Sequence, residues 1–426
     1  MNYSFSQLPH GLRIATIPMH DRNSAAVCIW VRAGGRFEPK IVSGVSHYLE
    51  HMLFKGTRKR TTRQIKEEIE GVGGMLNAFT SEEVTCYFAK VLNQHFPKAL
   101  DVLSDMVNHA TLTDVEIEKE RTVILEEIKM YRDLPAHYVH ELMSEIMWPA
   151  QPLGRPLAGT VESVSALKRR QIVDYKNRYY DPKNILVTIA GPVQHQEVED
   201  QVKAFFPYKS SRPLSRFPEA VSRQAKPRTL FVEKQTEQTH FVIALHGFSR
   251  ENPDRYKLGV LNVILGANMS SRLFEEVREK RGLAYEIKSG LSFYEDAGSV
   301  SISAGVESKK AATAIAVILR ELAKICRDGV KEGELRRAKD YFLGQLFMGL
   351  EDTLDHALWI GEKVMYSNEL PRLEEIRENI EAVSASDVRE VARKIFKTKN
   401  LNLALIGPIP DKVQKRIQKD FELDGF

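Results

Sequence analysis

Cysteine is scarce in this chain, and long apolar runs are absent. The three cysteines among 426 residues, Cys28, Cys86 and Cys326, are far apart and form no CxxC pair. They provide no disulfide framework, so we expect a reducing compartment. No run of about 18 apolar residues occurs, which predicts that the chain does not span a membrane. The first residues also lack the basic and apolar regions of a signal peptide. We therefore expect a cytoplasmic location.

An excess of charge of one sign is missing as well. Sixty-one basic side chains against 57 acidic ones give a net charge of +4. This mild balance does not indicate a nucleic-acid partner, and no RNA- or DNA-binding signature is present. Hydrophobic residues form 43% and charged residues 28% of the chain, which excludes wholesale disorder and fibrous repeats. At roughly 100–200 residues per domain, the length predicts two to four domains.

Proline clusters near the middle of the chain. Residues 206–228 hold four prolines among serine, arginine and lysine, a composition typical of a linker. On either side the chain weakly repeats itself. Residues 162–192 and 381–408 each combine a helical pattern, a short apolar strand and a Gly-Pro pair, and the two Gly-Pro pairs lie 216 positions apart. This offset predicts an internal duplication of about 210 residues.

Both halves place strand patterns before long helical patterns. The expected strands lie at 27–31, 76–88, 241–245 and 290–305, and the expected long helices at 116–132 and 310–327. Strands paired with runs of helices predict an α+β fold, in which each half is a mostly antiparallel sheet with helices packed on one face. We expect an N-terminal half at 1–206, a linker at 207–228 and a C-terminal half at 229–426.

The most informative motif is His-Tyr-Leu-Glu-His at 47–51, inside a helix-compatible stretch at 42–53. His47 and His51 lie one helical turn apart on one face, so both can reach one Zn²⁺. Glu50 points towards the same region, where it is badly placed as a third ligand but well placed to hold an attacking water. The motif is the inverse of HExxH. The alternative is a pair of exposed histidines beside a solvated glutamate, and the motif favours a metal site.

A catalytic zinc also needs a third protein ligand and an open position. The strongly helical segment 114–133 carries Glu116, Glu120 and Glu127 along one stripe, and its opposite face is apolar. Such a stripe is more often solvated surface than a ligand set. With a zinc site already predicted, one of these carboxylates is the natural third ligand. The chemistry of the residues leaves Glu120 and Glu127 both open.

This arrangement resembles a known family. The HYLEH motif, followed 76 residues later by Glu127, is similar to the pitrilysin/insulinase family of inverted zinc peptidases. The similarity covers essentially the whole chain, and it is closest to the branch that contains the mitochondrial processing peptidase and its bacterial relatives. Further matching segments lie at 51–60, 73–88, 120–135 and 270–285.

The resemblance implies a complete catalytic set in the N-terminal half. It implies that His47, His51 and Glu127 hold one Zn²⁺ per chain and that Glu50 is the general base. Glu120 would orient a ligand histidine from outside the metal's own shell. We therefore expect zinc as the cofactor.

The resemblance also implies substrate contacts. Asn77 and Ala78 would lie on an edge strand that holds an extended peptide by strand addition. Without the family, Asn77 indicates a turn. Arg278 and Tyr285, in the C-terminal half, would hold a substrate carbonyl and hydrogen-bond the developing oxyanion, respectively. The alternatives are a salt bridge on a charged helix for Arg278 and an ordinary strand aromatic for Tyr285.

The C-terminal half lacks the zinc motif. Near the positions equivalent to the HYLEH motif stand Asn262, Leu265 and Gly266, and near the equivalent of Glu127 stands Gln345. We expect this half to complete a substrate chamber that closes like a clamshell, as the family does.

Other motifs carry less weight. His137 and His140 could form a second metal pair, but no carboxylate or thiol partner stands out. The stretch 266–271 lacks the phosphate-loop patterns and indicates a turn before a helix.

The sequence therefore predicts a zinc-dependent endopeptidase that hydrolyses peptides or unfolded polypeptide segments. The resemblance implies a homodimer. The mild charge and the lack of long apolar runs predict no nucleic-acid or membrane partner. Two alternatives remain open: a catalytically silent or partner-dependent subunit that binds peptides, and a zinc hydrolase of a non-peptide amide.

Overall fold

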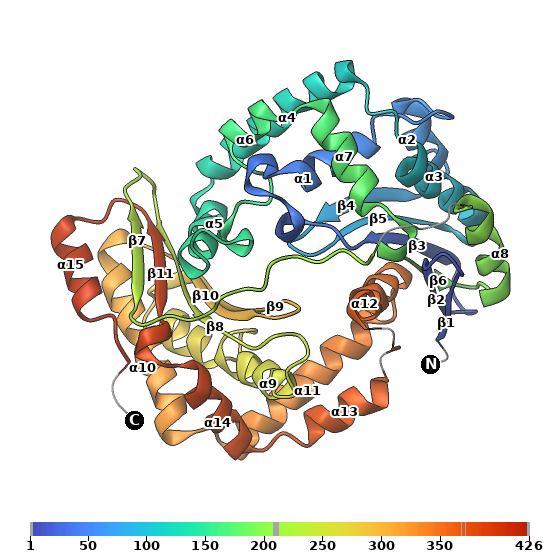
Figure 1. Cartoon of the computed structure of the whole chain (residues 1–426). Helices are drawn as coiled ribbons and strands as arrows, with labels where there is room; N and C mark the ends of the chain where they lie inside the picture. Colours follow the sequence, from blue (N-terminus) through green and yellow to red (C-terminus); the bar gives the residue numbers. More distant parts are fainter. Residues whose placement is uncertain (1–2, 208–212, 368, 371, 424–426) are drawn as a thin grey trace. The chain divides into compact units, whose positions relative to one another are not determined.

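The computed structural model describes residues 3–207, 213–367, 369–370 and 372–423 (Figure 1). Its chain forms two compact units, each built from three separate segments. The first unit comprises residues 1–128, 156–218 and 347–372, and the second comprises 129–155, 219–346 and 373–426.

These units differ from contiguous halves in two segments. Residues 129–155 belong to the second unit, and residues 347–372 belong to the first. Each segment contains a helix with an apolar face. The pattern of a helix indicates that such a face is covered, but it does not indicate which sheet covers it.

The first unit is built on a sheet in the order β1-β2-β6-β3-β5-β4. The strands are β1 (Ser4–Gln7), β2 (Arg13–Pro18), β3 (Ser24–Val31), β4 (Met75–Thr80), β5 (Thr85–Leu92) and β6 (Ile185–Gly191). Strands β2 and β6 are parallel, whereas the other neighbouring pairs are antiparallel. The outer edge of β4 has no strand partner among the described residues.

Alternate residues of β3 are buried on opposite faces of this sheet. Val27 and Ile29 join a large core with one set of helices, and Cys28 and Trp30 join a smaller core under α12 (Thr353–Tyr366). The first set contains α1 (Val45–Leu53), α2 (Thr62–Glu70), α3 (Phe96–His109), α4 (Asp114–Asp133), α6 (Val161–Ala166), α7 (Arg169–Tyr179) and α8 (His195–Phe205). The three cysteines are buried and unpaired with one another, as expected for small apolar side chains.

The second unit repeats this plan. Its sheet has the order β7-β11-β8-β10-β9, with β7 and β11 parallel and the other neighbours antiparallel. The strands are β7 (Arg228–Val232), β8 (Thr239–His246), β9 (Ala284–Phe293), β10 (Gly298–Val306) and β11 (Asn402–Ile406). Helix α5 (Pro135–Met147) packs against β8 and β11, as α12 packs against β3 and β6 in the first unit. The remaining helices of the unit are α9 (Arg255–Leu265), α10 (Ala311–Asp328), α11 (Glu332–Gly349, whose last residues belong to the first unit), α13 (Leu373–Glu381), α14 (Ala385–Ile395) and α15 (Asp411–Lys419).

The repeated Gly-Pro pairs end equivalent strands. Gly191 ends β6, and Gly407 follows β11 directly. A side chain at Gly191 would place its Cβ 2.9 Å from Ala25 Cα, and one at Gly407 would place it 2.3 Å from Thr239 Oγ1. Only glycine permits this approach of two strands, which explains why the repeat is visible at these positions.

The predicted α+β fold with two related, mostly antiparallel sheets is confirmed. The prediction that helices pack on one face only is wrong. Helices α12 and α5 each pack on the sheet face opposite the larger set of helices, because both faces of each sheet are apolar. No helix among the described residues is long and apolar enough to cross a membrane.

Candidate metal centre

Helix α1 carries the His-Tyr-Leu-Glu-His motif. It begins at Val45, after Gly44, which has a φ of +92°. The buried Glu38 carboxylate accepts hydrogen bonds from the backbone N–H groups of Gly44 (2.7 Å) and Ser46 (2.8 Å), so an anion satisfies the start of the helix. Tyr48, Leu49 and Met52 are buried, which orients the histidines away from the core.

Helix α4 supplies the carboxylates. Ile117, Ile124 and Ile128 are buried on one face, as predicted, and Glu120 and Glu127 lie on the face that approaches α1. Glu120 is buried, whereas Glu127 is partly exposed. Glu116 forms an ion pair with Lys119 instead (2.7 Å).

Three of the predicted residues converge on one point. The His47 Nε2 atom lies 3.7 Å from Glu127 Oε1, and the His51 Nε2 atom lies 3.5 Å from Glu127 Oε2. One ligand atom from each of these residues lies within 4.8 Å of the others, and the described ranges contain no other such group of three. Glu120 instead accepts a hydrogen bond from His51 Nδ1 at 2.9 Å. The geometry therefore distinguishes the two candidate third ligands: Glu127 faces the Nε2 atoms of both histidines, and Glu120 contacts His51 Nδ1.

The residues present fit a zinc ion. Two ligands at about 2.1 Å from a tetrahedral zinc lie roughly 3.4 Å apart, close to the separations of 3.5 and 3.7 Å between the histidines and Glu127. Two imidazole nitrogens and one carboxylate oxygen are also a donor set of catalytic zinc sites, which leave one position open. The bond from His51 Nδ1 to Glu120 fixes the tautomer, so the lone pair of Nε2 faces Glu127.

The protonation of the histidines reflects their surroundings. Burial, with the adjacent His51, lowers the pKa of His47 to about 4, so its imidazole is neutral at pH 7. Burial alone would lower the pKa of His51, but its hydrogen bond to Glu120 and the charge of Glu127 raise it. Burial raises the pKa of Glu127. The neutral imidazole of His47 has a lone pair available to a metal ion.

Glu50 lies beside this cluster on the same helix. Its Oε2 accepts a hydrogen bond from the Thr80 hydroxyl at 2.5 Å. Burial raises the pKa of Glu50, and the Thr80 hydrogen bond acts in the opposite direction. A carboxylate whose pKa is raised by burial is a better proton acceptor than a solvated one. Thr80 was not singled out by the sequence, although it lies only two residues beyond Ala78.

Asn77 and Ala78 lie on β4, the edge strand next to α1. The Asn77 side chain is exposed, and its Oδ1 accepts a hydrogen bond from the Ala78 backbone N–H at 2.8 Å. The predicted edge-strand position is therefore observed, and Asn77 is not a turn residue. Whether these residues bind a peptide stays a prediction.

Arg278 and Tyr285 belong to the second unit. Arg278 lies in a π-helical turn, Phe274–Glu279, and Tyr285 lies at the start of β9. The guanidinium carbon of Arg278 is 4.9 Å from the centroid of the Tyr285 ring and 4.6 Å from that of Phe274. Tyr285 is 78% exposed, so its ring and hydroxyl are accessible on the second unit. The pair is thus brought together on the surface of its own unit.

Comparison with known proteins assigns the family. Residues 13–161 match the model of the insulinase family, peptidase family M16, and residues 166–342 match that of the peptidase M16 inactive domain. The chain is 38% identical over 418 residues to an uncharacterized zinc protease of Streptomyces coelicolor, covering 96% of this chain and 90% of the relative. It is 37% identical over 399 residues to the uncharacterized zinc protease YmxG of Bacillus subtilis, covering 94% and 97%.

The chain belongs to the insulinase family, peptidase family M16. The family predicted from the HYLEH motif is therefore confirmed. Two solved structures show the same fold. A protease from Helicobacter pylori matches with a TM-score of 0.88 at 23% identity, over 96% of this chain and 99% of that one. A peptidase M16 inactive domain from Pseudomonas fluorescens matches with a TM-score of 0.89 at 18% identity, over 96% and 98%.

The M16 chain carries its metal-ligand candidates in the first unit. In the second unit, Asn262 and Leu265 lie on α9, and no group of three metal-ligating side chains occurs there among the described residues. His137 and His140 lie on α5 and belong to no such group within the same ranges. The inactive-domain model matches residues 166–342, a range that includes strands β7 to β10 of the second unit.

Proposed function

We propose that this M16 chain is a zinc-dependent endopeptidase that hydrolyses peptides or unfolded polypeptide segments. The observation that carries the proposal is the convergence of His47, His51 and Glu127, with Glu50 beside them. The similarity to proteins named zinc proteases supports it.

His47, His51 and Glu127 would hold the metal, one ion per chain. When bound, zinc polarises a scissile carbonyl and makes a water molecule more acidic. Glu50 accepts the proton of the attacking water and passes it to the leaving amine. Glu120 keeps the His51 ring in the orientation that presents Nε2 to the metal.

Substrate binding is assigned to two places in the chain. The free edge of β4 at Asn77 and Ala78 would hold an extended peptide by main-chain hydrogen bonds, which suits an unfolded substrate. In the second unit, the Tyr285 hydroxyl would donate a hydrogen bond to the oxyanion, and Arg278 would hold a substrate carbonyl. The exposure of Tyr285 and its stacking on Arg278 support these roles.

A silent or partner-dependent subunit is the second candidate. Such a subunit would bind peptides without cleaving them, and the match of residues 166–342 to the peptidase M16 inactive domain supports this candidate. The complete set of two histidines and two glutamates in this chain favours the active enzyme.

Metal removal tests the proposal. We expect the purified chain to cleave a quenched, unstructured peptide containing basic residues, to lose that activity after chelation, and to regain it with Zn²⁺ but not Mg²⁺, since Mg²⁺ prefers oxygen ligands. His47→Ala should abolish activity, whereas the control variant His137→Ala should retain it. Full activity in the metal-free protein would contradict the proposal.

We further propose that the enzyme is a cytoplasmic homodimer. The chain has little charge imbalance to keep copies apart, and the resemblance stated above implies pairing. Sedimentation equilibrium should give twice the mass of the chain at working concentration. A strict monomer that still cleaves peptides would contradict the proposed homodimer.

A further inference from the structure

Glu120 has two partners in its buried position. One carboxylate oxygen, Oε1, accepts the His51 Nδ1 hydrogen bond at 2.9 Å, and the other, Oε2, lies 2.6 Å from Lys55 Nζ. The Glu120 side chain is only 5% exposed. Among the described residues, Lys55 is the one lysine or arginine within ion-pair distance of this carboxylate. A chain of contacts therefore runs from Lys55 through Glu120 to the metal-facing histidine.

Lys55 is held in place from both sides along the chain. It follows the last turn of α1, where its backbone N–H donates to the Met52 carbonyl at 3.1 Å. The next residue, Gly56, turns the chain with a φ of +110°, and its carbonyl accepts hydrogen bonds from the Thr111 backbone (3.1 Å) and hydroxyl (3.2 Å). The backbone at Lys55 is thus fixed between α1 and the segment that enters α4.

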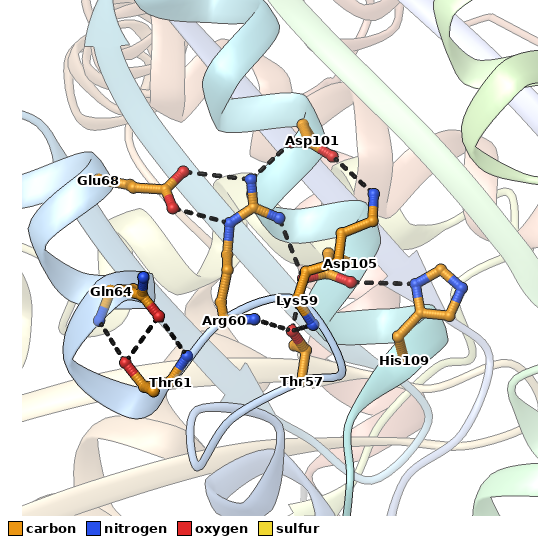
Figure 2. Close-up of polar contacts among 9 residues, drawn as sticks. All are labelled: Thr57, Lys59, Arg60, Thr61, Gln64, Glu68, Asp101, Asp105 and His109. Carbon is orange, nitrogen blue, oxygen red and sulfur yellow. Dashed lines mark hydrogen bonds and ion pairs between the residues drawn. The ribbon is translucent and has the colours of Figure 1, made fainter.

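The loop after Lys55 is anchored by a partly buried arginine, Arg60 (Figure 2). Arg60 binds both oxygens of Glu68 (3.0 and 3.1 Å), and its Nη1 donates to Asp105 Oδ2 at 3.0 Å. The Thr57 hydroxyl donates to the same Asp105 oxygen at 2.6 Å. Bidentate and charge-assisted bonds of this kind are strong and directional. The network fixes residues 56–61 to α2 and α3, and it leaves Lys55 pointing at Glu120.

A buried carboxylate needs a cation partner to remain ionised and fixed. Without Lys55, Glu120 would be a buried anion whose second oxygen has lost its charged partner, which is costly. Its carboxylate could then rotate or relax towards solvent, and the hydrogen bond that orients His51 would weaken. Residues outside the metal's own shell commonly change metal affinity tenfold or more in this way.

We propose that Lys55 is a positioning residue of the metal centre, which holds Glu120 on His51 and thereby strengthens zinc binding. The inference rests on the proposed function because it assumes that His51 is a zinc ligand. Positioning and direct electrostatics predict opposite changes in zinc affinity when the Lys55 charge is removed. A lysine near a cation site repels the cation, so charge alone predicts tighter zinc binding after its removal, whereas positioning predicts weaker binding.

Zinc affinity measured by competition with a chromophoric chelator tests this directly. We expect Lys55→Met, which keeps the length of the side chain, to weaken zinc binding about tenfold. Lys55→Arg should restore most of the affinity, since arginine can also bind a carboxylate. Lys59→Met is the matched control, because Lys59 lies in the same loop and forms an ion pair with Asp101, at 3.8 Å, instead of with Glu120.

A double-variant cycle shows whether Lys55 acts through Glu120. In a Glu120→Gln background, Lys55→Met should cause no further loss of zinc affinity. Unfolding of the metal-free variants by urea reports whether the fold itself has changed. Unchanged or tighter zinc binding by Lys55→Met would overturn the inference, and so would an equal loss in Lys59→Met.

The same proteins separate this inference from the proposed function. If wild type cleaves peptide and Lys55→Met binds zinc equally well, the positioning role fails while the peptidase stands. If wild type binds zinc without cleaving, the peptidase fails, and the affinities still decide the role of Lys55. If wild type binds no zinc, both are wrong.

Discussion

The glutamates near α1 differ in the partners that their carboxylates contact. Glu120 and Glu127 lie seven residues apart on one helix, about 700° of rotation, and so share a face. Glu127 faces the Nε2 atoms of both histidines, whereas Glu120 faces Nδ1 of His51 alone. Glu50 differs from both because its carboxylate accepts a hydrogen bond from the Thr80 hydroxyl. The three carboxylates therefore have three different sets of contacts.

Thr80 is expected to orient the general base. Thr80→Val keeps the shape of the side chain but removes the hydrogen bond to Glu50, and losing a bond to a charged group costs about 1.5–3 kcal/mol. We predict that kcat falls roughly tenfold or more, while KM and zinc content change little. Steady-state kinetics and metal analysis measure these quantities.

Thr80→Ser provides the control, because it retains the hydroxyl. It should keep kcat within about threefold of wild type, since the hydrogen bond is preserved. Equal kcat values for the valine variant and wild type would remove Thr80 from the mechanism.

The clustering of residues from α1 was predictable at this scale because helical spacing fixes which side chains share a face. His47, Glu50 and His51 needed only the period of 3.6 residues. The choice of Glu127 over Glu120 rested on resemblance, since the approach of α4 to α1 is a matter of packing. The contacts of Thr80 and Lys55 could not be predicted from the sequence, because the partner of a single hydroxyl or ammonium group depends on how the chain folds.

At the scale of elements, one glycine lets a helix approach its sheet. Gly361 lies in α12, and a Cβ there would meet Trp30 Nε1 at 2.1 Å. The same indole N–H donates to Thr188 Oγ1 at 3.1 Å, so the ring cannot move without losing that bond. At Gly361, the close packing that glycine permits stabilises the protein by more than the low helix propensity of glycine destabilises it.

Gly361→Ala is therefore expected to destabilise the protein. Helix propensity alone would favour alanine by about 1 kcal/mol, but overpacking of this kind costs about 1–3 kcal/mol or more. We predict a lower urea midpoint. Gly344→Ala, in α11, should raise the midpoint slightly, because nothing lies within 4 Å of its Cβ. The same shift in both variants would contradict the packing argument.

The buried histidine at the end of β8, His246, should make stability depend on pH. Burial, with nearby Arg228, lowers the pKa of His246 at the end of β8 to about 4, against about 6.5 in an unfolded chain. Below pH 6.5 the unfolded state binds a proton that the folded state does not. Stability is therefore complete above about pH 6.5 and falls as the pH drops towards 4.

His246→Leu tests this linkage. Neither ring nitrogen of His246 has a hydrogen-bond partner within the described ranges, so an apolar replacement should be tolerated at pH 7. At pH 5 the variant should avoid a penalty of up to about 2 kcal/mol. Its urea midpoint should therefore fall less than that of wild type between pH 7 and pH 5. The exposed His20, replaced by leucine, serves as the control. An unchanged pH dependence in His246→Leu would contradict the assignment.

At the scale of the whole molecule, the duplication is visible in sequence but the exchange of segments is not. The Gly-Pro pairs and the strand patterns predicted two related sheets, and the strand orders agree. Helices α5 and α12 follow equivalent long helices in the two halves, yet each belongs to the compact unit of the other half. An amphipathic pattern specifies a buried face and leaves the covering sheet undetermined, so no local signal could reveal this exchange.

One paired measurement tests the central claim most directly. Wild type and Glu50→Gln are purified, and bound zinc and cleavage of a quenched unstructured peptide are measured on the same samples. Because Glu50 is assigned as the base and not as a ligand, both proteins should bind about one zinc per chain, and only wild type should cleave. Cleavage by Glu50→Gln at the wild-type rate, or a zinc-loaded wild type that cleaves no peptide, would contradict the account.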